Sequence, residues 1–276
     1  MERAIEYMTR AIEEKNDIPL WYSELAQYYD ASNKNFRECL AIFRKNIDVV
    51  KEDVAVPKSL VQFYNLDGDY DDAIDFLQTH HSRTWEGGRG IHWHYVDAHT
   101  LKALQLIKDK KYGEAISHLE TAMLYPENLE VGKPLDDERN AMIYYYLGVA
   151  YDKMNNTKKA KESFQKSVDA KNSRRMSDQI YYQAKAYEKL GRGVKVKQMF
   201  NNLIRIGQDQ RKNGTNVSLI AVQESSSSDY QIISNAYYLE ALGNKGLGKT
   251  PEEKKLFESA IKEYNNNLCA GIIMDN

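Results

Sequence analysis

The sequence predicts an all-α protein, a right-handed α-α superhelix of about six helix pairs with inserted loops. Three observations predict this fold class. Small and large side chains recur in one order in successive segments along nearly the whole chain. Only 5 of the 276 residues are proline, which permits long helices because proline removes a backbone donor inside a helix. The chain also holds 20 tyrosines, which suit helix seams where one end of the ring is buried and the other is wet.

The clearest helix pair is predicted in residues 145–170, YYLGVAYDKMNNTKKAKESFQKSVDA. Gly148 is a small residue on the first helix, and Ala160, Phe164 and Ser167 form a small–large–small series on the second. Two helices approach closely only where small residues lie at their crossing, and the large residues then fill the gaps beside it. The segment therefore predicts two closely packed helices joined by a turn.

The same columns recur in order through the chain. The small position on the first helix is occupied by Ala26, Val61, Ala103, Gly148, Ala184 and Ala241. The second helix opens with Cys39, Ala73, Ala115, Ala160 and Val196. Four residues later stand Phe43, Leu77, Leu119, Phe164, Phe200 and Phe257. One such match is common in amphipathic helices, but six in order indicate an internal repeat.

On these columns the chain resembles the tetratricopeptide-repeat (TPR) family, whose pattern has the same positions over about 34 residues. The resemblance covers nearly the whole chain and implies a solenoid in which each helix pair contacts only its neighbours. Long insertions follow the second, third and fifth units, and Glu253 stands where a small residue is expected. The predicted units of this single array are 1–18 (a half repeat), 19–53, 54–90, 91–140, 141–176, 177–230 and 231–276.

The turns that precede the second helices carry residues that break helices. These turns are predicted at 33–36 (NKNF), 67–70 (DGDY), 108–112 (KDKKY) and 191–193 (GRG), because glycine, asparagine and aspartate favour turns. The first element of the chain is an extra second helix with apolar Ile5, Met8 and Ile12 and no first helix before it. We expect that the chain is cut from a longer protein, or that this helix packs on something absent.

Five of the six histidines lie in residues 80–99, HHSRTWEGGRGIHWHYVDAH. His92, Tyr95 and His99 are spaced i, i+3 and i+7, so they share one helical face. A zinc site needs three or four convergent ligands, and nothing in the spacing requires such convergence. The favoured interpretation is packing, so no metal site is predicted. As a hypothesis, Trp85, His92, Tyr95 and His99 form a loop site that contacts a partner.

A narrower resemblance comes from WEGG at 85–88 and YPENL at 125–129, with Gly132 and Pro134 following. On these motifs the chain is similar to the helical region of a bacterial family of uncharacterised function. In that family a β-rich amino-terminal part resembles carbohydrate-active enzymes. The resemblance implies that this chain is the C-terminal helical part without its β-rich partner. We expect the insertion 125–140 either to pack on the other insertion or to mark a domain-docking site.

Signatures of catalysis are scarce. No GxSxG, GxGxxG or HExxH motif occurs, and the one phosphate-loop match, GNKGLGKT at 243–250, lacks the preceding strand that the motif needs. A turn between two helices explains that segment. The sequence therefore predicts no enzyme activity and no cofactor. The rival hypothesis of a metal-dependent enzyme is supported only by the histidine cluster.

The composition limits the classes of binding partner that the sequence indicates. The formal net charge of -2 gives no indication of nucleic-acid or membrane binding. No apolar run approaches the length needed to span a bilayer, and the charged amino-terminal stretch is no signal peptide, which favours the cytoplasm. Cys39 and Cys269 lie far apart and predict neither a disulfide framework nor a zinc site.

In this architecture the first helix of each pair lines a concave groove. By the column register, the fifth position of that helix points into the groove, and the twelfth and ninth positions add polar groups. The predicted groove residues are Tyr145, Tyr181, Tyr238, Asp152, Glu188 and Lys185. Rigid amphipathic rings suit recognition of an extended peptide or stacking on the face of a sugar. The alternative is that these tyrosines only pack between repeats.

The functional hypothesis is a non-catalytic TPR scaffold that binds a protein or peptide through its groove and inserted loops. The expected partner is either a separate protein or peptide or the chain's own missing N-terminal domain. The alternative is an accessory C-terminal region that positions or oligomerises a carbohydrate-active or otherwise β-rich multidomain protein.

Overall fold

The computed structural model describes residues 1–53, 55–82, 89–134, 139–171, 177–213 and 229–275. Within these ranges the chain forms helices and turns and no strand, which confirms the predicted all-α helical repeat. It divides into two compact units, Met1–Lys102 with Leu124–Lys133 (unit 1), and Ala103–Met123 with Pro134–Asn276 (unit 2). Among the described helices, none is both long enough and apolar enough to cross a membrane.

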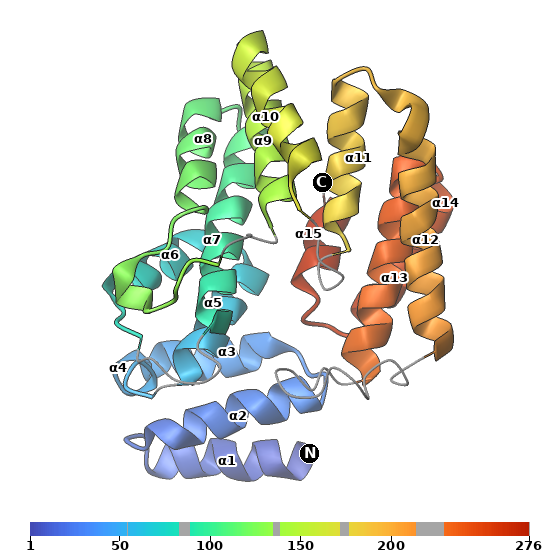
Figure 1. The fold of residues 1–276 in the computed structure, drawn as a ribbon. Helices are drawn as coiled ribbons and strands as arrows, with labels where there is room; N and C mark the ends of the chain where they lie inside the picture. Colours follow the sequence, from blue (N-terminus) through green and yellow to red (C-terminus); the bar gives the residue numbers. More distant parts are fainter. Residues whose placement is uncertain (54, 83–88, 135–138, 172–176, 214–228, 276) are drawn as a thin grey trace. The chain divides into compact units, whose positions relative to one another are not determined.

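Unit 1 is built from short helices joined by tight turns (Figure 1). They are α1 (Glu2–Glu14), α2 (Pro19–Ala31), α3 (Phe36–Lys45), α4 (Ile47–Val50), α5 (Val56–Asp67), α6 (Tyr70–Thr79), most of α7 (Arg89–Lys108) and the 3-10 helix η1 (Glu127–Leu129). Helix α2 packs on α1 and α3, and α5 packs on α6.

Two of the predicted turns in unit 1 are confirmed. The side chain of Asn35 accepts a hydrogen bond from the backbone nitrogen of Arg37 at 3.0 Å, which satisfies a donor that the start of α3 leaves without a helical partner. Gly68 ends α5 with φ +88°, a left-handed conformation that costs little only without a Cβ atom. Helices α2 and α3, and α5 and α6, are therefore joined where the sequence predicts a turn.

Unit 2 contains the longer helix pairs. They are the end of α7, α8 (Tyr112–Thr121), α9 (Asn140–Lys153), α10 (Thr157–Asp169), α11 (Gln179–Lys189), the 3-10 helix η3 (Gly193–Lys195), α12 (Val196–Asn213), α13 (Asp229–Gly246), α14 (Thr250–Glu263) and α15 (Leu268–Asp275). Helix α9 packs on α10, α13 packs on both α12 and α14, and the first helices α9, α11 and α13 contact one another in that order.

The predicted columns lie at the helix crossings. A Cβ atom added to Gly148 would lie 2.5 Å from the Phe164 ring, so the glycine lets α9 and α10 approach closely. The other small residues on the first helices are buried: Ala26, Val61, Ala103, Ala184 and Ala241. The large residues on the second helices are buried as well: Phe43, Leu77, Leu119, Phe164, Phe200 and Phe257. The alternation of small and large residues thus fixes the pairing of helices.

The phosphate-loop match is a helix end and a turn. Helix α13 runs to Gly246, Gly248 has φ +72°, and α14 begins at Thr250. A Cβ atom on Gly243 would lie 2.6 Å from Ile204 Cγ1, so this glycine serves the packing of α13 on α12. The interpretation of 243–250 as an inter-helix turn is confirmed.

Candidate functional site

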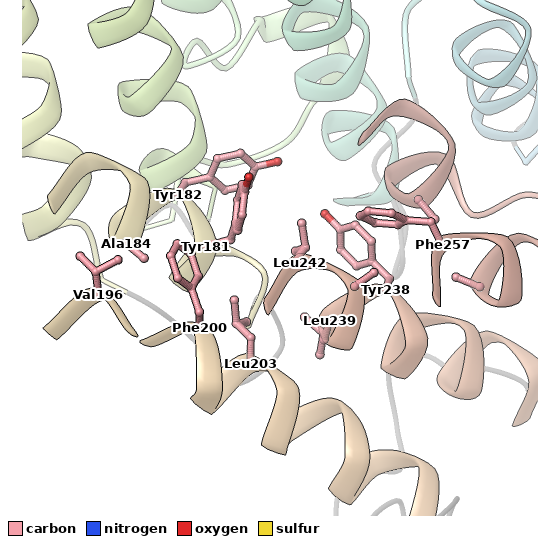
Figure 2. Packing of buried hydrophobic residues seen from close by; sticks show 13 residues of the cluster. Tyr181, Tyr182, Ala184, Val196, Phe200, Leu203, Tyr238, Leu239, Leu242 and Phe257 are labelled. Carbon is pink, nitrogen blue, oxygen red and sulfur yellow. The ribbon is translucent and has the colours of Figure 1, made fainter. Parts of the chain in front are cut away.

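The fifth-position tyrosines pack inside their own helix pairs, each on the large residue of the following helix. The ring centroids are 6.0 Å apart for Tyr145 and Phe164, 5.8 Å for Tyr181 and Phe200, and 6.3 Å for Tyr238 and Phe257. Figure 2 shows the last two pairs within the core of unit 2. The expected orientation into an open groove is therefore wrong for Tyr181 and Tyr238, which are 8% and 2% exposed. Tyr145 is half-buried.

Three tyrosines meet where the first helices α9, α11 and α13 contact one another, and we call Tyr146, Tyr182 and Tyr238 the tyrosine cluster; Tyr238 therefore contacts both Phe257 and this cluster. The rings of Tyr146 and Tyr182 contact each other edge to face, with centroids 5.6 Å apart. The hydroxyl of Tyr182 is within hydrogen-bonding reach of those of Tyr146 and Tyr238. The packing of α9, α11 and α13 thus gathers three phenol groups that are 36 and 56 residues apart in the sequence.

The surroundings keep these phenols neutral. Burial raises the pKa of Tyr182 and Tyr238 well above the ordinary value of 10.0, and the Tyr146 hydroxyl and the Asp178 carboxyl add to the rise in both, whereas the hydrogen bond with Tyr182 lowers the pKa of Tyr238. Burial also raises the pKa of Asp178, against the opposing pull of Arg139. The Gln179 side-chain amide donates to Asp178 Oδ2 at 3.3 Å. The tyrosine cluster is therefore a set of neutral hydroxyl donors and acceptors beside a carboxyl group.

Charged groups occupy the other end of the same helices, and we call Asp152, Lys185, Glu188 and Lys189 the charged patch. Lys189 Nζ on α11 lies 3.1 Å from Asp152 Oδ2 on α9, and Lys185 Nζ lies 2.5 Å from Glu188 Oε2. The carboxylates of Asp152 and Glu188 are exposed. Each of the three polar residues predicted from the column register thus takes part in one of these two ion pairs.

The charged patch adjoins the tyrosines through Tyr145. Burial raises the pKa of Tyr145 to about 12, with a contribution from the carboxylate of Glu188. The Tyr145 hydroxyl also acts on the Tyr146 phenol, raising its pKa further beyond the effect of burial. The electrostatic interactions thus connect Glu188 with Tyr145, Tyr145 with Tyr146, and Tyr146 with Tyr182, across α9 and α11.

The predicted loop site is interior where the structure describes it. His92, Tyr95 and His99 on α7 are 3%, 5% and 3% exposed. His92 Nε2 lies 2.9 Å from the Leu124 carbonyl oxygen, and its ring stacks on Tyr125 with centroids 3.8 Å apart. These residues hold the segment 124–133 against α7, which agrees with the packing interpretation. Trp85 lies outside the described residues.

Asn128 fixes the same segment on α6. Its side-chain nitrogen donates to the Leu77 and His80 carbonyl oxygens at 2.8 and 2.7 Å. Its backbone carbonyl oxygen accepts a hydrogen bond from the backbone nitrogen of Ser82 at 2.9 Å. In the described part of the chain, no three histidine, cysteine, aspartate or glutamate side chains are arranged to hold a metal ion.

No family model matches the chain. Similar solved structures include BtubC (BKLC) from P. vanneervenii, at 14% identity over 95% of this chain and 90% of that one, with a TM-score of 0.34. YrrB, a TPR protein with an unusual peptide-binding site, is 14% identical over 99% and 100%, with a TM-score of 0.25. The TPR domain of P58(IPK) is 15% identical over 98% and 90%, with a TM-score of 0.30.

Proposed function

We propose that the chain is a non-catalytic helical scaffold of the TPR type that binds a protein or peptide through the charged patch and Tyr145. The observation that carries the proposal is the ion pair between Lys189 on α11 and Asp152 on α9, because it joins the first helices of two successive repeats into one polar surface. A peptide that crosses both helices meets carboxylates, ammonium groups and a phenol there.

The chemistry of the patch favours exchange with a partner. Exposed ion pairs contribute only about 0–1 kcal/mol, because water and salt screen them. The lysine partners of Asp152 and Glu188 can therefore be replaced by a partner's charged side chains at little cost. The Tyr145 ring is held by its contact with Phe164, and such a fixed amphipathic ring contacts a ligand with little loss of side-chain entropy.

The test uses a peptide selected on the folded chain from a random display library and labelled for fluorescence anisotropy. The variant Asp152→Lys with Glu188→Lys reverses two charges of the patch, and we expect its Kd for that peptide to rise at least about tenfold, the equivalent of about 1.4 kcal/mol. The matched control is Glu162→Lys with Glu258→Lys, the same charge change at exposed positions of the second helices α10 and α14. Equal affinity of the two double variants would contradict the proposal.

The alternative from the sequence, an accessory region of a carbohydrate-active or otherwise β-rich protein, depends on the motifs at 85–88 and 125–134 alone. No contact among the described residues favours it over a separate scaffold, and the partner remains a protein or peptide in either case.

A further inference from the structure

The last helix returns to the tyrosine cluster. Ala270 on α15 is fully buried and packs in the core cluster that contains Tyr182 and Tyr238. Cys269 lies close enough to the phenols of those two tyrosines to act on them electrostatically. Helix α15 contacts α14, and through Ala270 and Cys269 it also reaches Tyr182 on α11 and Tyr238 on α13.

One side chain both begins this helix and ties it to α13. Asn267 Oδ1 accepts a hydrogen bond from the Ala270 nitrogen at 3.0 Å, which caps the first turn of α15. Asn267 Nδ2 donates to Ser234 Oγ at 2.8 Å, and that hydroxyl donates to the Ala260 carbonyl oxygen at 2.6 Å. The anchor thus connects α15 with the pair α13 and α14 through a single asparagine.

The helix pair formed by α13 and α14 has the same column contacts as the other repeats. Tyr238 contacts Phe257, and the small residues Ala241 and Ala260 are fully buried, as in the columns of the other repeats. Helix α15 has only 8 residues, LCAGIIMD, and an isolated helix so short is marginal in water. Its helical form is therefore imposed by the surface on which it lies, in the manner of a bound peptide.

We propose that α15 is an intramolecular ligand of the tyrosine cluster, and that a partner binds there by displacing it with an apolar helix that carries alanine or glycine at the place of Ala270. The small residue is required because Ala270 has no exposed surface and lies in the buried core cluster that contains Tyr182 and Tyr238. The short connection after α14 keeps α15 at a high effective concentration, so the partner competes with it. This inference depends on the proposed partner-binding role of the same first helices.

The experiment adds the segment that contains α15 to the protein as a separate peptide. The probe is a fluorescein-labelled peptide of residues 264–276 with Cys269→Ser, and its binding is measured by fluorescence anisotropy. The full chain with Ala270→Trp cannot seat its own α15, so we expect it to bind the peptide at least about tenfold more tightly than the unmodified chain does. The same peptide carrying Ala270→Trp is expected not to bind.

Two further variants make the outcome decisive. Gly271→Ala is the matched control, because an added Cβ atom there meets nothing within 4 Å, and it is expected to behave as the unmodified chain. Asn267→Ala removes the anchor and is expected to give intermediate binding. If the Ala270→Trp chain keeps its helical circular dichroism and its cooperative unfolding but binds no peptide, the proposal is overturned. If it loses cooperative unfolding, α15 is part of the structural core and the proposal is overturned as well.

The result is separable from that for the charged patch. Failure of the trans peptide, with the Asp152→Lys and Glu188→Lys effect on the selected peptide intact, would remove only the role of α15. Loss of that charge effect, with the trans peptide still bound, would remove the charged patch and leave the tyrosine cluster as the binding site.

Discussion

Each unit of the molecule has an asparagine that fixes a segment outside the repeat columns onto repeat helices, and the two differ in what else holds that segment. In unit 1, Asn128 donates to two backbone carbonyl oxygens, and the stacked rings of His92 and Tyr125 add a second attachment. In unit 2, Asn267 makes one capping bond and one bond to a hydroxyl, and the buried Ala270 and the ring contact between Tyr264 and Tyr230 add further attachments. The comparison teaches that the same side-chain amide fixes a loop by bridging backbone carbonyl oxygens in one unit and fixes a short helix by capping its first turn in the other.

The largest expected effect comes from removing one large core side chain in each unit. Phe43 and Phe200 are 0% and 1% exposed, and replacing a buried phenylalanine by alanine costs about 3–5 kcal/mol. Helix pairs in a repeat array depend mainly on their neighbours. Phe43→Ala is therefore expected to accelerate amide hydrogen exchange in α2, α3 and α5, and Phe200→Ala in α11, α12 and α13. A uniform loss of protection along the whole chain after either change would contradict this local response.

A smaller effect separates the two asparagines. Asn128→Ala leaves two inward carbonyl oxygens without their donor and is expected to lower the free energy of unfolding by about 1–3 kcal/mol. Asn267→Ala removes a helix cap and is expected to cost about 0.5–2 kcal/mol. Urea denaturation measures both, and Asn235→Ala, at an exposed position of α13, serves as control with a change within about 0.5 kcal/mol. A larger cost for Asn267→Ala than for Asn128→Ala would reverse the interpretation of the two segments.

The smallest effect is a pH dependence of stability to which Tyr182 in unit 2 contributes. A phenol whose pKa is raised on folding contributes stability that is fully present below its ordinary pKa of 10.0 and is lost as the pH rises from there through the raised pKa. The free energy of unfolding should therefore fall as the pH is raised above 10.0, and Tyr182→Phe should make that fall shallower. Urea denaturation at a series of alkaline pH values checks this. Tyr7→Phe, at a residue 64% exposed, should leave the slope unchanged; an equal change in both variants would contradict the prediction.

Part of this structure could be predicted from local patterns. The columns through Gly148 and Phe164 predicted which helices pack closely, and Asn35 and Gly68 predicted where two helix pairs turn. The same reasoning places Asp152, Lys185 and Glu188 on one groove surface, because positions along one helix and its successor in a regular repeat are related by geometry, and this placement stays a prediction. The reasoning misplaced Tyr181 and Tyr238, because one step along a helix turns a side chain by about 100°. The chain has paired tyrosines at 145–146 and 181–182, so the pattern could not distinguish the inward ring from the neighbouring one.

The sequence by itself determined the helices, their pairing and the turns between them, since these depend on side-chain size and on residues a few positions apart. Only the tertiary structure decided where the non-repeating segments return. Asn128 meets Leu77 across 51 residues, and Asn267 meets Ser234 across 33. Such contacts form only after the helix pairs have created the surface that receives the segment, so no periodicity in the sequence records them.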